Sequence, residues 1–185
     1  MAINGIFIIA SIGDEAHERI AAIQREFDPK LAATSPPHVT IAGSSGVGPM
    51  DPNTPIEEIR AALEPIVATT PPLILPYGPP IRFMQTTIIV VPLDPHGPLR
   101  TFHERIARSG LRFDRPRFAF TPHSTLSFYP THPPEVLRRL LSIRVREPAV
   151  IDRISVQHTT DPQPSRTLLE LTLSGEAATR VPTPR

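Results

Sequence analysis

Hydrophobic and polar positions alternate along the chain in short segments that predict a mixed α/β protein. Short apolar, β-branched segments are typical of buried strands, and they recur at residues 3–12, 38–42, 72–75, 87–91, 123–128, 150–158 and 167–173. Apolar residues at spacings of three and four predict helices, at residues 14–27, 54–68, 97–109 and 133–143. We expect the first helix to begin at Asp14 and to stop at Asp28-Pro29, and Gly110 to close the third.

The order strand, helix, strand, helix, strand occurs twice, which predicts two related halves within one fold. We place the halves at about residues 1–80 and 81–175, followed by a frayed tail at residues 176–185. A chain of 185 residues has the size of one ordinary domain, since single domains run to about 100–200 residues. The expectation is therefore a single bilobal domain of the α/β (α+β) class.

Composition adds two unusual features to this picture. The chain has 25 prolines, which predict many rigid loops between regular elements. Lys30 is the one lysine among 19 basic residues, so the rest are arginines. Arginine suits bidentate phosphate contacts, but a coding bias accounts for the same count. The net charge of +1 creates no overall field that would indicate a nucleic-acid or membrane partner.

Several classes of site and location are excluded or disfavoured by what the sequence lacks. There is no cysteine, so disulfides, thiolate metal sites and cysteine nucleophiles are excluded. The apolar segment at residues 5–12 has no basic region before it and no cleavage pattern after it. No apolar run approaches the 18 or so residues of a membrane span. We expect a soluble, cytoplasmic monomer without a membrane partner.

Candidate chemistry appears where the repeat places histidines. The first half reads Pro-His38-Val-Thr40-Ile, and the second reads Pro-His123-Ser-Thr125-Leu, 85 residues later. Because positions i and i+2 of a strand point to the same face, each half presents an imidazole beside a hydroxyl. If a pseudo-twofold axis relates the halves, the two pairs face each other across a groove. A third such spacing, at His158, lacks the preceding proline and the following aliphatic residue, and we interpret it as coincidence.

Two opposed imidazoles suit in-line displacement at phosphorus. One can take a proton from the attacking water while the other gives a proton to the leaving oxygen. The reference pKa of histidine, about 6.5, allows a neutral and a protonated copy to coexist near neutral pH. The threonine hydroxyls and nearby backbone N–H groups can hold the non-bridging oxygens as negative charge develops. This scheme requires no metal and no cofactor.

The paired pattern resembles the 2H phosphoesterase superfamily, named for its two H-x-[ST]-hydrophobic motifs, and within it the bacterial proteins called 2′-5′ RNA ligase or cyclic phosphodiesterase. The resemblance covers about residues 3–173. It implies a bilobal fold with His38, Thr40, His123 and Thr125 lining a central cleft. It also implies metal-independent cleavage of 2′,3′-cyclic phosphates on RNA ends or small nucleotides. The second motif departs from the pattern, because Ser127-Phe128-Tyr129 replaces a continuation that is often basic.

Four further residues are candidates for binding substrate. Ser44 lies in a glycine-rich loop whose N–H groups could face phosphate, although a plain connection is the more ordinary interpretation. Arg117 ends an arginine-rich stretch that could attract a polyanion or form a solvated face. Phe128 and Tyr129 could stack on a base or belong in part to the core. Four other histidines show no metal-ligand spacing and are interpreted as surface residues: His17, His96, His103 and His132.

Two alternatives remain open for the function. The same site could act on a 2′-5′ linkage or on ADP-ribose cyclic phosphate, by hydrolysis or ligation. A second alternative, from another class, is an RNA-binding module that keeps the fold without catalysis. Both histidine–threonine pairs are intact, which favours catalysis.

Overall fold

The computed structural model describes residues 4–83, 86–160 and 165–176. The strands are β1 (Asn4–Ala10), β2 (Val39–Ala42), β3 (Leu73–Leu75), β4 (Ile81–Arg82), β5 (Ile89–Pro92), β6 (His123–Ser127), β7 (Ala149–Ile151), β8 (Arg153–Thr160) and β9 (Arg166–Thr172). The helices are α1 (Asp14–Phe27), α2 (Pro29–Thr34), α3 (Ile56–Ala68), α4 (Gly97–Ala107) and α5 (Pro134–Ser142). Of the expected frayed tail, residues 177–185 lie outside the described residues.

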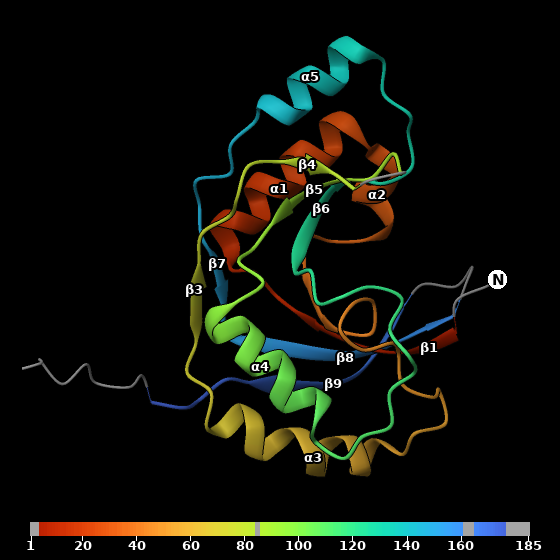
Figure 1. The fold of residues 1–185 in the computed structure, drawn as a ribbon, viewed down its shortest axis with the longest axis vertical. Coiled ribbons are helices and arrows are strands. Elements are labelled where there is room, and N and C mark those ends of the chain that lie inside the picture. Colours follow the sequence, from red (N-terminus) through yellow and green to blue (C-terminus); the bar gives the residue numbers. More distant parts are fainter. Residues whose placement is uncertain (1–3, 84–85, 161–164, 177–185) are drawn as a thin grey trace, which may run out of the picture.

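The repeated order of elements is confirmed, as β1-α1-β2-α3-β3 and β5-α4-β6-α5-β7, followed by β8 and β9. These elements form two lobes (Figure 1). The lower lobe contains an antiparallel sheet of order β2-β1-β8-β9, with α3 packed against β9 and α4 against β2. The upper lobe contains an antiparallel sheet of order β4-β5-β6 with α1 and α2. Strands β3 and β7 form a separate pair at one side.

The two halves of the sequence exchange helices between the lobes. Helix α1, from the first half, packs on β6, and α4, from the second half, packs on β2. The Gln24 amide in α1 donates to the Thr125 carbonyl at 2.8 Å, and the His103 imidazole in α4 donates to the Ile41 carbonyl at 2.7 Å. Strand β8, from the second half, also pairs with β1 of the first half, and β9 pairs with β8. Sheet membership therefore does not follow the division that we placed at residue 80.

The two motif strands have matching registers in their sheets. Ile9 of β1 lies opposite Thr40, and Val90 of β5 lies opposite Thr125. In both pairs the register shifts immediately before that residue of the partner strand. Such irregularities bend a strand and re-aim its side chains. The repeat thus extends to the backbone geometry beside each motif.

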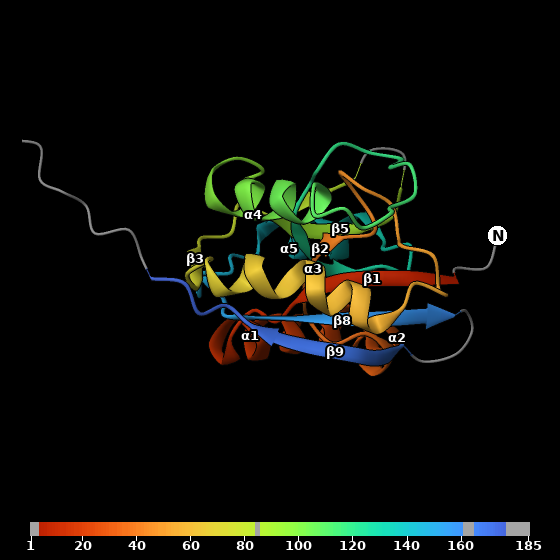
Figure 2. The same cartoon turned by 90° about the horizontal axis from the view of Figure 1, so that it is seen from below.

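One continuous apolar core supports this arrangement. Ile6 and Ile8 of β1, Leu63 of α3 and Phe102 of α4 are almost completely buried in it. Helix α3 lies below β8 and β9 in Figure 1 and in front of the strands in the view from below (Figure 2), so it covers the lower face of this sheet. None of the helices within the described residues is long and apolar enough to cross a bilayer.

Three local predictions were incomplete. The single strand expected at residues 150–158 is two strands, because the backbone changes partner from β3 to β1 at Asp152. The break is marked in the sequence by two successive charged residues, Asp152 and Arg153, both of which are exposed and interrupt the alternation of apolar and polar positions. Helix α2 was missed, although Asp28 caps it by accepting the Leu31 N–H at 3.0 Å and Pro29 takes the first helical position, as proline commonly does. The two-residue strand β4 was also missed.

Candidate active site

The two histidine motifs meet where β2 approaches β6. The Ser124 hydroxyl donates a hydrogen bond to the backbone carbonyl of His38 at 3.0 Å, so the strands touch although they belong to different sheets. His38 immediately precedes β2, and His123 is the first residue of β6. The side chains of His38, Thr40, His123 and Thr125 are all half-buried.

Both imidazoles are oriented by the same backbone contact. Nδ1 of His38 lies 2.8 Å from the carbonyl oxygen of Pro36, and Nδ1 of His123 lies 2.8 Å from that of Thr121. Because a carbonyl only accepts, Nδ1 must carry the proton in each ring. The proline between donor and acceptor restricts the backbone there. In the neutral rings, Nε2 therefore keeps the lone pair, as a proton acceptor requires.

The environment lowers the pKa of both rings. Burial lowers the pKa of His38 and of His123 below the ordinary imidazole value, and the hydrogen bond to the carbonyl partly opposes this by raising it. The charge of protonated His38 lowers the pKa of His123 further. Without a bound anion, both imidazoles are therefore expected to be neutral at pH 7. A phosphate anion between them would favour protonation of one ring.

Removal of the His38 charge is expected to raise the pKa of His123. His38→Gln replaces an imidazole that can be protonated by a neutral side chain, so the repulsion that disfavours the His123 imidazolium disappears. NMR titration of the His123 ring measures this shift, and His158→Gln serves as the control because His158 bonds to Asn4 (2.9 Å) and not to the site. An unchanged or lower pKa of His123 in His38→Gln would show that the rings do not interact.

The threonine hydroxyls are available to a ligand. Among the described residues, neither the Thr40 nor the Thr125 hydroxyl makes an intramolecular hydrogen bond. The Thr125 backbone is nevertheless fixed, because its carbonyl accepts from Gln24. Each of these hydroxyls shares a strand face with its histidine.

Sequence reasoning missed two residues that support His123, one directly and one through Thr121. The ring of Phe83 meets the His123 ring edge-on, with centroids 4.8 Å apart. The Ser45 hydroxyl accepts the Thr121 N–H at 3.1 Å, and it therefore anchors the residue whose carbonyl accepts from His123. Ser45 is buried, whereas its neighbour Ser44, which the sequence singled out, is exposed. No local signal distinguishes the two serines, because the contact comes from a residue 76 positions away.

The interpretation of His103 as a surface residue was wrong. Its side chain is only 5% exposed, and its ring stacks on Phe120 at 3.9 Å between centroids. Burial lowers the pKa of His103, while Nδ1 donates to the Ile41 carbonyl. Gly46 has a φ of 74° and lies so close that a Cβ would collide with the imidazole. His103 thus packs β2 and its following loop against α4.

The predicted aromatic residues lie just beyond the end of β6. Phe128 and Tyr129 are 46% and 45% exposed, with ring centroids 5.1 Å apart. The buried carboxylate of Asp28 accepts both backbone N–H groups, at 2.7 and 2.9 Å. The ammonium of Lys30 lies 4.0 Å from the Tyr129 ring centroid. Two exposed rings are therefore held on an anchored backbone.

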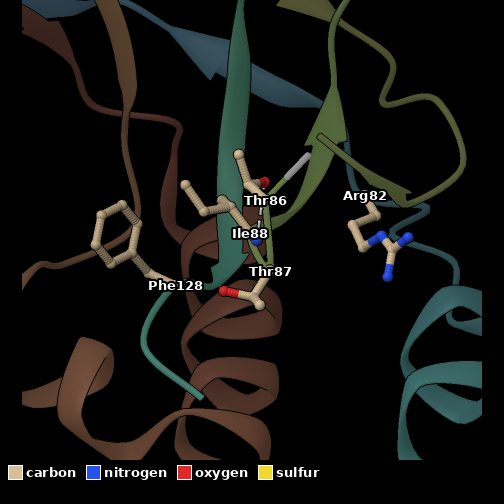
Figure 3. Close-up of a pocket in the computed structure, with 5 residues that line it drawn as sticks. All are labelled: Arg82, Thr86, Thr87, Ile88 and Phe128. Carbon is tan, nitrogen blue, oxygen red and sulfur yellow. Dashed lines mark hydrogen bonds between the residues drawn. The ribbon is translucent and has the colours of Figure 1, made fainter. Parts of the chain in front are cut away.

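Phe128 also borders an open depression of about 630 Å³. Its other lining residues are Arg82, Thr86, Thr87 and Ile88, and Figure 3 shows Phe128 facing the Thr86–Ile88 segment. Arg82 and Thr86 lie on either side of Phe83 along the chain, and Phe83 contacts His123. Residues that line the depression therefore flank, along the chain, the aromatic ring that contacts His123.

Arg117 and Ser44 lie on two loops that are joined by backbone hydrogen bonds. The Gly46 N–H donates to the Phe118 carbonyl at 2.9 Å, and the Gly48 N–H donates to the Asp114 carbonyl at 2.9 Å. Arg117 and Ser44 are both exposed. Within the described part of the chain, no group of three or more His, Cys, Asp or Glu residues is arranged to hold a metal ion.

Comparison with known proteins gives a consistent result. A family model described as the 2′-5′ RNA ligase superfamily matches residues 12–163. No curated protein sequence matches significantly. The chain is similar to the crystal structure of apo E. coli LigT, with a TM-score of 0.57 and 15% sequence identity over 92% of this chain and 98% of LigT. It is also similar to LigT in complex with 3′-AMP, with a TM-score of 0.57 and 14% identity over 94% of this chain and 99% of LigT. A third similar structure is TT0787 of Thermus thermophilus, with a TM-score of 0.58 and 11% identity over 95% of this chain and 100% of TT0787. At these identities the structures establish a common fold.

Proposed function

The chain belongs to the 2′-5′ RNA ligase superfamily, and we propose that it hydrolyses 2′,3′-cyclic phosphates on RNA ends or small nucleotides with His38 and His123. One observation carries the proposal. Two imidazoles in equivalent positions of the repeat each donate Nδ1–H to a carbonyl, which leaves Nε2 of each for proton transfer. The groups needed for acid–base chemistry all come from the chain itself.

The proposed reaction is an in-line displacement. Neutral Nε2 of one histidine takes a proton from water as the water oxygen bonds to phosphorus. The bond from phosphorus to one ribose oxygen breaks, and protonated Nε2 of the other histidine gives that oxygen a proton. The product is a phosphomonoester beside a free hydroxyl, and the two histidines have exchanged protonation states. Proton transfer with water then restores the starting form.

Thr40 and Thr125 are proposed to bind the non-bridging phosphate oxygens. Their hydroxyls lie on the same strand faces as the histidines and make no competing bond within the described residues. Hydroxyl donors aimed at oxygens that gain negative charge stabilise the transition state. Since two threonines and backbone N–H groups can share this role, the loss of one should be milder than the loss of a histidine.

Phe128 and Tyr129 are proposed to bind the nucleoside part of the substrate. An exposed aromatic ring can stack on any base, at about 1–3 kcal/mol per base. The Asp28 carboxylate fixes the backbone of both residues, so the main chain that carries the rings loses little freedom on binding. Arg82 in the same depression is suited to a phosphate of the nucleotide.

Arg117 and Ser44 are proposed to contact phosphates further along an RNA chain. Their loops are joined by backbone hydrogen bonds and carry exposed side chains. Arginine is suited to bidentate phosphate contacts. Arg117→Ala should raise the KM of an oligonucleotide with a cyclic phosphate end more than that of a cyclic mononucleotide.

Incubation with a 2′,3′-cyclic mononucleotide and a chelator tests the proposed function. We expect conversion to a nucleoside 2′- or 3′-monophosphate, followed by ³¹P NMR, at an unchanged rate when chelator is added. The His38→Ala/His123→Ala double variant is the control for contaminating activity. Binding without turnover would support the RNA-binding alternative, and turnover only of a 2′-5′ linkage or of ADP-ribose cyclic phosphate would keep the site but change the substrate.

A further inference from the structure

A chain of hydrogen bonds connects Tyr77 to the backbone of His38. The Ser124 hydroxyl lies 3.0 Å from the His38 carbonyl oxygen and 2.9 Å from the Tyr77 hydroxyl. A carbonyl only accepts, so the Ser124 hydroxyl donates its one proton to the His38 carbonyl oxygen. Tyr77 must then donate to Ser124. Burial raises the pKa of Tyr77 to about 12, so this phenol remains a donor at neutral pH.

We infer that Ser124, held by Tyr77, is a positioning residue that fixes His38 relative to His123. The inference rests on the proposed function, since it concerns the same pair of histidines. Ser124 lies between His123 and Thr125 in β6, and its side chain points to the opposite strand face. It is fully buried and bonds to the main chain of His38, so it acts through His38 and not on a substrate.

The link has no counterpart in the other half of the repeat. The residue equivalent to Ser124 is Val39, whose apolar side chain cannot make the reciprocal bond to the His123 carbonyl. A single buried hydroxyl therefore ties β6 to the residue that begins the other motif. Tyr77 lies in the segment between β3 and β4, where the first half of the chain passes into the second. The link thus connects the two motifs and the crossing between the halves.

Loss of this link should reduce the rate more than the affinity. Both histidines must reach one phosphate, and a displacement of about 1 Å can cost roughly a hundredfold in rate. Without the Ser124 hydroxyl, the His38 carbonyl loses its partner and β2 can move away from β6. The residues proposed to bind the nucleoside are anchored separately, by Asp28.

The experiment compares Ser124→Ala, Tyr77→Phe and their combination with Ser127→Ala. Ser127 is the matched control because it is fully buried in the same strand but bonds to His132 at 2.8 Å. With a cyclic mononucleotide, Ser124→Ala should lower kcat by about 10–100-fold with little change in KM. Ser127→Ala should leave kcat near the wild-type value. Ser124→Thr keeps the hydroxyl and should recover most of kcat.

Tyr77→Phe tests whether Tyr77 acts on His38 through the Ser124 hydroxyl. It should lower kcat less than Ser124→Ala, because Ser124 can still donate to His38. It should cause no further loss in the Ser124→Ala background, since its effect passes through that hydroxyl. If Tyr77→Phe lowered kcat by the same factor in the wild type and in Ser124→Ala, the inference would be overturned. If Ser124→Ala does not fold, Tyr77→Phe must still lower kcat without changing KM, and an unchanged kcat would count against the link.

A titration without substrate separates this inference from the proposed function. In the free protein, Ser124→Ala should move the pKa of His38 toward the ordinary value, because a looser strand exposes the ring to water. Ser127→Ala should not. If the wild type hydrolyses no cyclic phosphate, the proposed function fails, yet the His38 titration still decides the positioning role. An unchanged pKa of His38 in Ser124→Ala would overturn it.

Discussion

Replacement of either His38 or His123 by alanine is expected to lower kcat/KM for a 2′,3′-cyclic nucleotide by roughly 10²–10⁴-fold, the usual contribution of a positioned proton donor or acceptor. Each ring is fixed by one carbonyl through Nδ1, so neither ring can take over the position of the other. Steady-state kinetics in each variant measures the loss. The double variant should lose less than the product of the single losses, because both groups act in one transition state.

The pH profile and a decoy histidine provide the checks on this result. With one base and one acid, kcat/KM should follow a bell-shaped curve whose limbs belong to the pair. Since burial lowers the pKa of both free rings, we expect the curve to lie on the acidic side of one for ordinary imidazoles. His158→Ala removes the third histidine–threonine spacing and should leave activity nearly intact. A loss at His158 without a loss at His38 would show that the motifs were paired wrongly.

Asp28→Ala is expected to lower the free energy of unfolding by about 2–4 kcal/mol, since bonds to a charged group contribute about 1.5–3 kcal/mol each and overlap in effect. The Asp28 side chain is 1% exposed and accepts three backbone N–H groups, from Leu31, Phe128 and Tyr129. Its removal takes the cap from α2 and frees the segment after β6. Urea unfolding measures the loss.

The activity of the same variant separates structure from binding. If Phe128 and Tyr129 hold the nucleoside, Asp28→Ala should also raise KM, because their backbone is no longer anchored. Asp28→Asn, which keeps a neutral acceptor, should lie between wild type and alanine in both measurements. The control is Asp51→Ala, since Asp51 is exposed and its carboxylate accepts from the nearby Asn53. Equal destabilisation by Asp28→Ala and Asp51→Ala would contradict the anchoring role.

The sequence by itself predicted the repeated order of elements and the two histidine motifs. Those features are local. Apolar periodicity marks a strand or helix from neighbouring residues alone, and the i, i+2 spacing puts His38 with Thr40 and His123 with Thr125 on one strand face. The proline before each histidine belongs to the same local pattern, and the structure adds its reason in the Nδ1–carbonyl bonds.

The tertiary structure decided which elements share a lobe and what surrounds each histidine. The exchange of α1 and α4, the pairing of β8 with β1, the burial of His103, and the contacts of Ser45 and Ser124 all join residues far apart in the sequence. A local pattern fixes which face of an element is apolar, but several partners can cover such a face equally well. Packing of the whole core decides which partner covers the face. For this reason the sequence predicted the histidine pair but not the residues, such as Ser45 and Ser124, that hold the pair in place.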